Sequence, residues 1–231
     1  MFYHLKSYYY RIYKLLSWYN QVKNQGTNTY VHSSVQVIGW KYAKIGDNSI
    51  ISEDTWINVN HHQPNIFSIK IGNNCFIGRR NFLNSGGDLE INDYCLTGPD
   101  CCFLGSDHVY DSPFNPYIAT GATKSSIKIG VNCWLGAYVT VLKNVNIGYG
   151  SVIGASTLVN RNIPPFSLVV GNPCRIIKRF DISLNAWVDL KDYPEDSERL
   201  MPTESEYLEI LKKNHPKVHL PFLASSKIFS Q

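Results

Sequence analysis

Hydrophobic residues recur at every sixth position between Ile129 and Val159. An aliphatic residue opens each block of six, and a glycine often follows it. The opening residues are Ile129, Leu135, Val141, Ile147, Ile153 and Val159. The fifth position of each block is small or β-branched. A constant period of six fits neither an α-helix nor an alternating strand, whereas it is typical of a parallel β-helix.

The expected structure is a three-sided prism with about six residues on each side and about 18 in each coil. The first and fifth residues of each block point inward, and the fifth must be small to fit the corner. Stacked coils pair their backbone groups along the axis and bury a continuous apolar column. Free cysteine behaves as a small hydrophobe, so the cysteines at fifth positions are predicted to be reduced core residues. These are Cys75, Cys95, Cys101 and Cys133.

The period can be followed back to about Val31, with interruptions at 61–65, at Gly86-Gly87 and at 105–127. The last interruption has no periodicity, and a loop of that length in a compact domain is usually functional. We therefore predict an all-β domain at 29–180 with an excursion loop at 105–127. A C-terminal extension follows at 181–231, where Thr203 and Glu206 form the capping box of a helix.

Residues 1–28 are predicted to form an amphipathic helix. Apolar residues follow each other at spacings of four and three, namely Leu5, Tyr9, Ile12, Leu16 and Tyr19. Four residues are basic, and no Asp or Glu precedes Asp47. The favoured interpretation is a cap over the open end of the prism, where strand edges need cover. The alternative is peripheral contact of residues 1–26 with an anionic membrane.

Composition narrows the class of protein. Hydrophobic residues make up 44% and charged residues 17% of the 231 residues, which argues against disorder. A net charge of +4 is too small to indicate a nucleic-acid partner. There is no run of 18 apolar residues and no signal-peptide pattern. The expected location is the cytoplasm, either free or at the inner face of the membrane.

The repeat, together with IPPFSLVVGNPCRIIKRF at 163–180, resembles the hexapeptide-repeat acyltransferases, in particular the branch that O-acetylates sugars and antibiotics. This resemblance implies a left-handed β-helix and a homotrimer. It also implies acetyl-CoA as cosubstrate, bound in the groove between two prisms, and no metal.

His108 is the candidate catalytic residue. Among the seven histidines it is the one at the root of the long loop, in GSDHVYDSPFNPY. Acyl transfer to a hydroxyl needs a base, and imidazole, with a pKa near 6.5, suits this role at neutral pH. The position matches the catalytic histidine of the resembling family. Asp107, Asp111 or a backbone carbonyl could orient the ring.

The resemblance also implies a donor site. The residues matching it are Trp134, Gly136, Ala137, Ala155, Asn160, Arg161, Arg175 and Lys178. Trp134 would border the acetyl pocket, and the two basic residues at the end would lie near the nucleotide phosphates. The sequence departs from the family where simple-sugar acetyltransferases hold the acceptor with an asparagine, because Gly78 stands there. Arg79, Arg80 and Asn81 follow it and are candidates for binding an acceptor, which could be anionic.

The predicted function is acetyl-CoA-dependent O-acetylation of a sugar in a bacterial surface polysaccharide or its precursor. N-acetylation of a nucleotide-linked amino sugar would use the same base and donor site. A zinc hydratase on the same fold would need three converging histidines, and the repeat near His108 offers no second one. A non-catalytic scaffold would have no need of the His108 loop. A serine acetyltransferase resembles neither this loop nor the C-terminal region.

Overall fold

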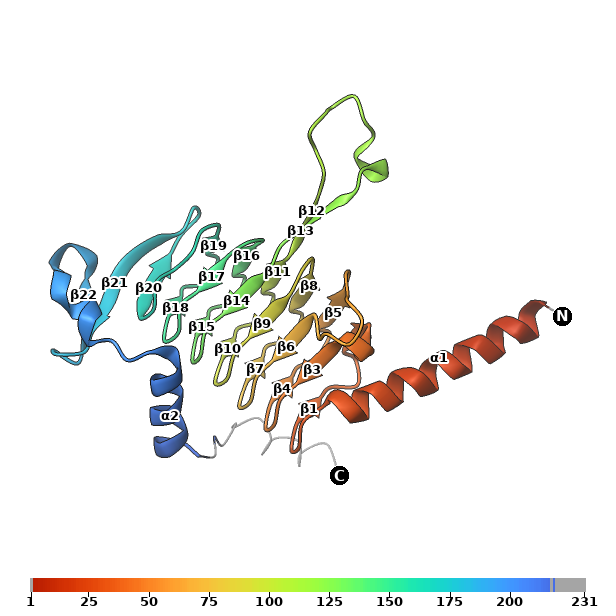
Figure 1. The fold of residues 1–231 in the computed structure, drawn as a ribbon, viewed down its shortest axis with the longest axis horizontal. Helices are drawn as coiled ribbons and strands as arrows, with labels where there is room; N and C mark the ends of the chain where they lie inside the picture. Colours follow the sequence, from red (N-terminus) through yellow and green to blue (C-terminus); the bar gives the residue numbers. More distant parts are fainter. Residues whose placement is uncertain (1, 217, 219–231) are drawn as a thin grey trace.

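The computed structural model describes residues 2–216 and 218. The chain winds into a three-sided prism whose strands run parallel from coil to coil (Figure 1). The first face is a nine-stranded sheet of β1 (Tyr30–Val31), β4 (Ile50–Ile51), β7 (Phe76–Ile77), β10 (Leu96–Thr97), β15 (Trp134–Leu135), β18 (Val152–Ile153), β20 (Ser167–Val170), β21 (Arg175–Asp181) and β22 (Ala186–Asp189). Its last two strands are antiparallel to their neighbours and close the prism.

Two further sheets complete the prism. The second face has β2 (Gln36–Ile38), β5 (Trp56–Val59), β8 (Phe82–Ser85), β11 (Cys102–Leu104), β16 (Thr140–Leu142) and β19 (Leu158–Val159). The third face has β3 (Ala43–Ile45), β6 (Ile69–Ile71), β9 (Leu89–Ile91), β14 (Ile127–Ile129) and β17 (Asn146–Ile147). Short 3-10 helices are η1 (Trp40–Tyr42), η2 (Tyr117–Ala119), η3 (Leu190–Asp192) and η4 (Glu195–Leu200).

The predicted apolar column is the core of the prism. The residues that open the blocks from Ile45 to Val159 are buried, and Phe103 is the largest fully buried side chain. Val31 and Val37, in the first coil, are half-buried against this core. The two inward positions of each block therefore place the apolar residues as the repeat predicts.

The corners of the prism depend on residues that tolerate a left-handed backbone. At the corner between the third and first faces, Asn28, Asn48, Asn74 and Asn132 have φ between 51° and 57°. Asparagine adopts this conformation more readily than other side chains, because its amide hydrogen-bonds locally. The side chains of Asn28 and Asn48 are also hydrogen-bonded to each other across coils, at 2.8 Å.

The cysteines lie in the core, as the repeat predicts. Burial raises the pKa of the Cys75 and Cys95 thiols well above their usual range, and it raises that of Cys101 to about 11. All six cysteines are reduced, and Cys102 is only half-buried.

Because the thiolate is the reactive form, Cys75, Cys95 and Cys101 should resist an aromatic disulfide reagent in the native protein. They should react only after unfolding in urea. Mass spectrometry of modified peptides provides the check, with the half-buried Cys102 as the internal comparison. Modification of Cys75 in the folded protein within minutes would contradict this burial.

The N-terminal helix forms, but Leu16 and Tyr19 of its predicted apolar stripe do not pack on the prism. α1 (Phe2–Asn24) leaves the prism beside β1 and extends away from it (Figure 1). The last turn of the helix is attached to the prism, because Asn24 Nδ2 donates a hydrogen bond to the Trp40 carbonyl at 2.8 Å. Leu16 and Tyr19, two residues of the predicted capping stripe, are instead exposed. Over the last two turns, the side of the helix that meets the body is polar. Leu5 and Tyr9 belong to the same stripe, and their side chains lie outside the described residues.

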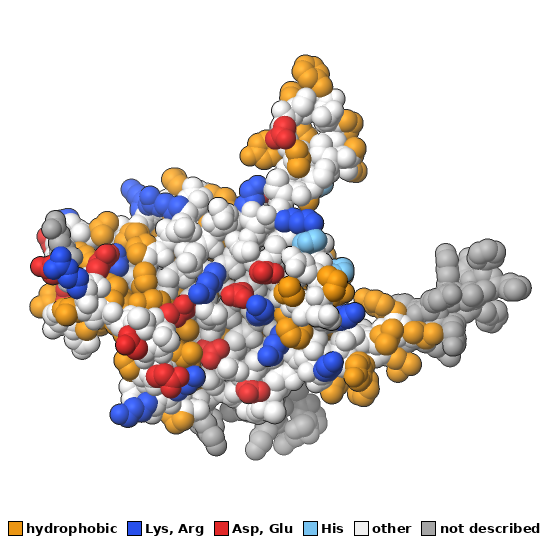
Figure 2. Space-filling model, viewed as in Figure 1, with side chains coloured by type: hydrophobic (Ala, Val, Ile, Leu, Met, Phe, Trp, Pro, Cys, Tyr) orange, Lys and Arg blue, Asp and Glu red, His pale blue; other side chains and the backbone are white. Residues whose placement is uncertain are grey.

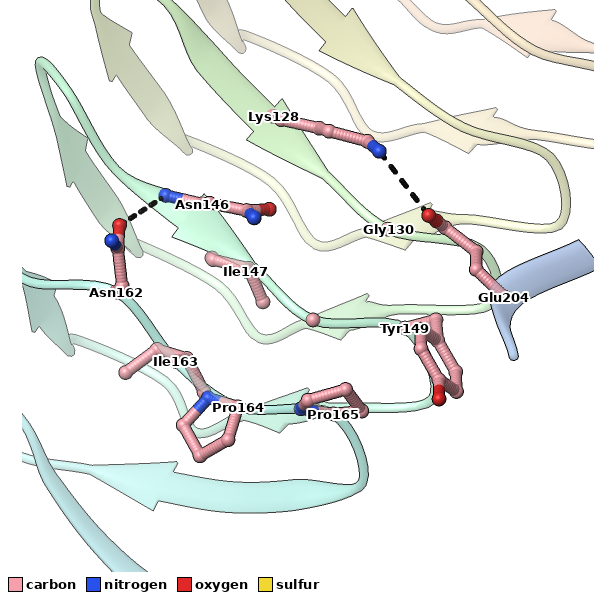
Figure 3. A pocket seen from close by; sticks show the side chains of 11 residues that line it. Lys128, Gly130, Asn146, Ile147, Tyr149, Asn162, Ile163, Pro164, Pro165 and Glu204 are labelled. Atoms are coloured by element: carbon pink, nitrogen blue, oxygen red, sulfur yellow. Dashed lines mark hydrogen bonds and ion pairs between the residues drawn. The ribbon is translucent and has the colours of Figure 1, made fainter. Parts of the chain in front are cut away.

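The C-terminal extension packs on the corner between the third and first faces. α2 (Glu204–Asn214) begins at the predicted capping box of Thr203 and Glu206. Glu204 accepts from the Val131 N–H at 3.0 Å and pairs with Lys128 at 3.2 Å. A hollow of about 420 Å³ lies between the start of this helix and strands β14 and β17 (Figure 3). His108 is not among its lining residues.

Candidate active site

The two large interruptions of the repeat lie side by side at the corner between the second and third faces, which we call the loop corner. Residues 60–68 connect β5 to β6, and residues 105–126 connect β11 to β14. The second excursion projects far from the prism (Figure 1). Lys124 Nζ, at its base, lies 2.9 Å from His61 Nδ1 of the first excursion. Interruptions at the same phase of a stacked repeat must lie at the same corner, which is the sequence signal for this pairing.

The base of the long excursion is an antiparallel ribbon of β12 (Ser106–His108) and β13 (Ala122–Lys124). The ribbon is regular secondary structure in a segment predicted as a loop. His108 pairs with Ala122 and is exposed. The candidate base is therefore held on a hydrogen-bonded ribbon, and the irregular chain begins beyond it.

Asp107 does not orient the His108 ring within one chain. Neighbouring residues of a strand point to opposite sides, and the Asp107 carboxylate pairs with Lys143 at 2.9 Å. Lys143 also donates to Thr123 Oγ1 at 3.0 Å. These contacts fasten both strands of the ribbon to the coil that follows. Among the described residues, the His108 ring itself makes no hydrogen bond.

A row of polar side chains on the second face leads to the ribbon. Asn84 Nδ2 donates to Ser106 Oγ at 3.2 Å, and Asn58 Nδ2 lies 3.5 Å from Asn84 Oδ1. Asn58 and Asn84 occupy the same register position on β5 and β8. This row cannot be predicted from the six-residue period, because the period does not specify which outward positions stack in register.

The corner between the first and second faces, which we call the donor corner, carries Gly136, Ala137 and Ala155. A Cβ on Gly136 would lie 2.7 Å from the Ala155 backbone nitrogen, so only glycine allows this close stacking of coils. Ala155 is exposed and Ala137 half-exposed. Trp134 precedes this corner on the first face and is 52% exposed.

The three acceptor candidates lie at the same donor corner in an earlier coil. Arg79 is exposed. Arg80 makes a two-pronged ion pair with Asp100, at 2.8 and 2.7 Å, and this partner raises the pKa of the arginine and lowers that of Asp100. Asn81 is buried, and its amide donates to the carbonyls of Gly78 and Gly98. The Asn81 side chain therefore stabilises the turn inside the prism, and it is not on a surface that a substrate reaches.

The other donor candidates lie elsewhere. Asn160 and Arg161 are at the loop corner, where Arg161 Nη2 donates to the Cys174 carbonyl at 3.0 Å. Arg175 and Lys178 are on β21, and Lys178 pairs with Asp189 at 3.1 Å. One chain thus places His108, Asn160 and Arg161 at the loop corner. It places Gly136, Ala137 and Ala155 at the donor corner, on a different edge of the prism.

Within 2–216 and 218, no three His, Cys, Asp or Glu side chains are grouped so as to hold a metal ion. No helix in this part of the chain is both long and apolar enough to cross a membrane.

Comparison with known proteins gave relatives of one kind, although no family model matches the chain. A putative acetyltransferase of Staphylococcus aureus is 40% identical over 120 residues, which are 51% of this chain and 58% of the relative. The galactoside O-acetyltransferase of Escherichia coli is 29% identical over 136 residues, 57% of this chain and 64% of the relative. The chain spans about half the length of the curated relatives it matches.

Two solved structures with a similar fold are also acyltransferases. AntD, an N-acyltransferase of Bacillus cereus crystallised with dTDP and coenzyme A, superposes with a TM-score of 0.58 at 19% identity, covering 80% of this chain and 90% of AntD. A hexapeptide-repeat acetyltransferase of Vibrio cholerae in complex with acetyl-CoA has a TM-score of 0.51 at 25% identity, covering 68% and 70%.

The fold is a left-handed parallel β-helix built from hexapeptide repeats, as predicted. The chain resembles the hexapeptide-repeat acyltransferases in this fold and, over about half of its length, in sequence, which confirms the resemblance drawn from the repeat.

Proposed function

We propose that this chain transfers an acetyl group from acetyl-CoA to a hydroxyl of a sugar in a bacterial surface polysaccharide or its precursor, with His108 as general base. The observation that carries the proposal is the place of His108. An exposed imidazole lies on an antiparallel ribbon at the root of the long excursion. The relatives named for acetyl transfer, one of them to a galactoside, support the reaction class.

The proposed reaction needs one proton acceptor. The neutral His108 imidazole takes the proton of the sugar hydroxyl as its oxygen attacks the thioester carbonyl. A tetrahedral intermediate forms and then collapses by breaking the carbon–sulfur bond. The departing thiolate receives the proton from the imidazolium, so the base is regenerated. The half-buried Asn58 and Ser106, which are linked through the buried Asn84, offer an amide and a hydroxyl that suit sugar hydroxyls.

We further propose that the site is completed by a second chain in a homotrimer. His108 and the Ala137–Ala155 column lie at different corners of one prism, so one chain cannot bring them to the same acetyl group. The outward row of the first face also favours a partner. It is apolar in continuous register, comprising Tyr30, Ile50, Phe76, Leu96, Trp134, Val152 and Leu168, of which Ile50 is already buried within the chain.

The third face provides the contrast. Its outward row is polar, comprising Lys44, Lys70, Glu90, Lys128 and Asn146. An apolar row with Leu96 and Trp134 at 41% and 52% exposure suits burial against a neighbour, whereas a charged row suits water. The neighbour would then bring its loop corner towards this donor corner.

Mixing two inactive variants tests this shared site. His108→Ala removes the base, and Ala155→Trp fills the donor corner without touching the core. Unfolding and refolding the two together in equal amounts should restore activity at about a quarter of the sites, those that combine an intact His108 with an intact Ala155 of the neighbour. Sedimentation should give three times the chain mass. No restoration, or an active monomer, would overturn the shared site.

A further inference from the structure

The described part of α1 turns its apolar side away from the protein. Six large side chains of α1 are between 56% and 65% exposed: Tyr13, Leu15, Leu16, Trp18, Tyr19 and Val22. At about 100° per residue, all of them except Tyr13 fall within an arc of about 160° on the helix. Figure 2 shows hydrophobic side chains gathered along this part of the helix, clear of the prism.

Over the last two turns of the helix, the opposite side is polar and faces the body. Ser17, Asn20 and Gln21 are partly covered, and Asn24 is buried with its amide on the Trp40 carbonyl. This orientation reverses that of an ordinary surface helix, whose apolar stripe packs on the core. The apolar side of α1 therefore contributes nothing to the described fold of one chain.

We propose that α1 lies on the surface of an anionic lipid bilayer, with its apolar side among the acyl chains. The charge of the N-terminal segment favours an anionic bilayer, because the first 28 residues contain four Lys or Arg and no Asp or Glu. Trp and Tyr are the side chains that favour the water–lipid boundary. Such helices bind through buried apolar area together with attraction to anionic lipids.

A second copy of α1 could also cover the apolar side of the helix, but the sequence of α1 suits such pairing less well. Helices that pair in water carry a narrower apolar seam flanked by charges of both signs. Three copies of this helix would bring only positive charges together. A cyclic trimer would instead place all three helices at the same end of the assembly, where they could bind one membrane together and strengthen attachment.

Flotation of the full-length protein with lipid vesicles tests the proposal. The protein should float with vesicles containing roughly a quarter phosphatidylglycerol in phosphatidylcholine, and much less with phosphatidylcholine alone. Raising the salt concentration should release it, because salt screens the attraction to the lipid headgroups.

Two matched variants separate the apolar side from the rest of the helix. Leu15→Gln with Trp18→Gln should lower the vesicle-bound fraction at least about tenfold. The control, Ser17→Gln with Asn20→Gln, adds the same glutamines on the body side and should bind within about twofold of the unmodified protein. Binding of the first variant equal to that of the control would overturn the proposal. So would a failure of the intact protein to float, or a smaller assembly for the first variant, which would assign the apolar side to a second copy.

Discussion

Replacing His108 by alanine should lower kcat about 10²- to 10⁴-fold, which is the usual contribution of a general base. This corresponds to a barrier about 3–5 kcal/mol higher. The affinity for acetyl-CoA should change little, because the proposed donor contacts come from residues other than His108.

His62→Ala is the matched control. His62 is an exposed histidine in the other excursion of the loop corner, stacked on Tyr42 with ring centroids 3.9 Å apart. Its removal should leave kcat within about twofold, because a surface ring away from the reacting groups changes little. Steady-state kinetics give kcat, and titration calorimetry gives donor affinity. If His108→Ala loses donor binding and activity together, the residue is structural. If it keeps normal turnover, the base lies elsewhere.

Phe103→Ala should destabilise the protein by about 3–5 kcal/mol, as is usual when a buried aromatic side chain is removed from a close-packed core. Phe103 is fully buried between Leu83 and Val141 on neighbouring coils. The coils cannot close over the lost volume, because their backbone hydrogen bonds fix their spacing.

Phe114→Ala gives the same chemical change without the burial, since Phe114 is 94% exposed at the excursion. It should alter stability by no more than about 0.5 kcal/mol. Urea unfolding at one fixed protein concentration measures both variants, because the stability of an oligomer depends on concentration. Equal midpoints for the two variants would contradict the assignment of the inward column.

The six-residue period predicts the fold well because one constraint repeats in every coil. Each coil must bury the same two positions, so Ile45 and Val159, far apart in sequence, have the same environment. The helix at Glu204 was also predictable, because its capping box is a local signal that requires only Thr203 and Glu206.

The orientation of α1 was not predictable in the same way. Its apolar stripe shows that one side avoids water, but it does not identify what covers that side. The contact that decides the orientation is polar, from Asn24 to Trp40, and joins residues 16 positions apart. A hydrophobic pattern carries no information about such a bond.

The sequence indicates individual residues of the candidate site, but it does not predict how these residues lie relative to one another. The repeat phase predicts that Asn81 points inward, because it occupies a fifth position, and the structure buries it there. The pairing of Arg80 with Asp100 and the row from Asn58 to Ser106 depend on which residues stack in register. The two excursions shift that register by different lengths, so the neighbours of His108 become visible only in three dimensions.

The most direct test of the proposed activity is the release of free coenzyme A thiol from acetyl-CoA in the presence of a panel of sugars, nucleotide sugars and surface polysaccharides. The account predicts thiol release that depends on an acceptor and on His108, with the product heavier by one acetyl group that mild alkali removes as an ester. Acetylation stable to alkali, on an amino sugar, would show N-acetylation instead. No thiol release with any acceptor, from a protein that binds acetyl-CoA and is folded, would contradict the account.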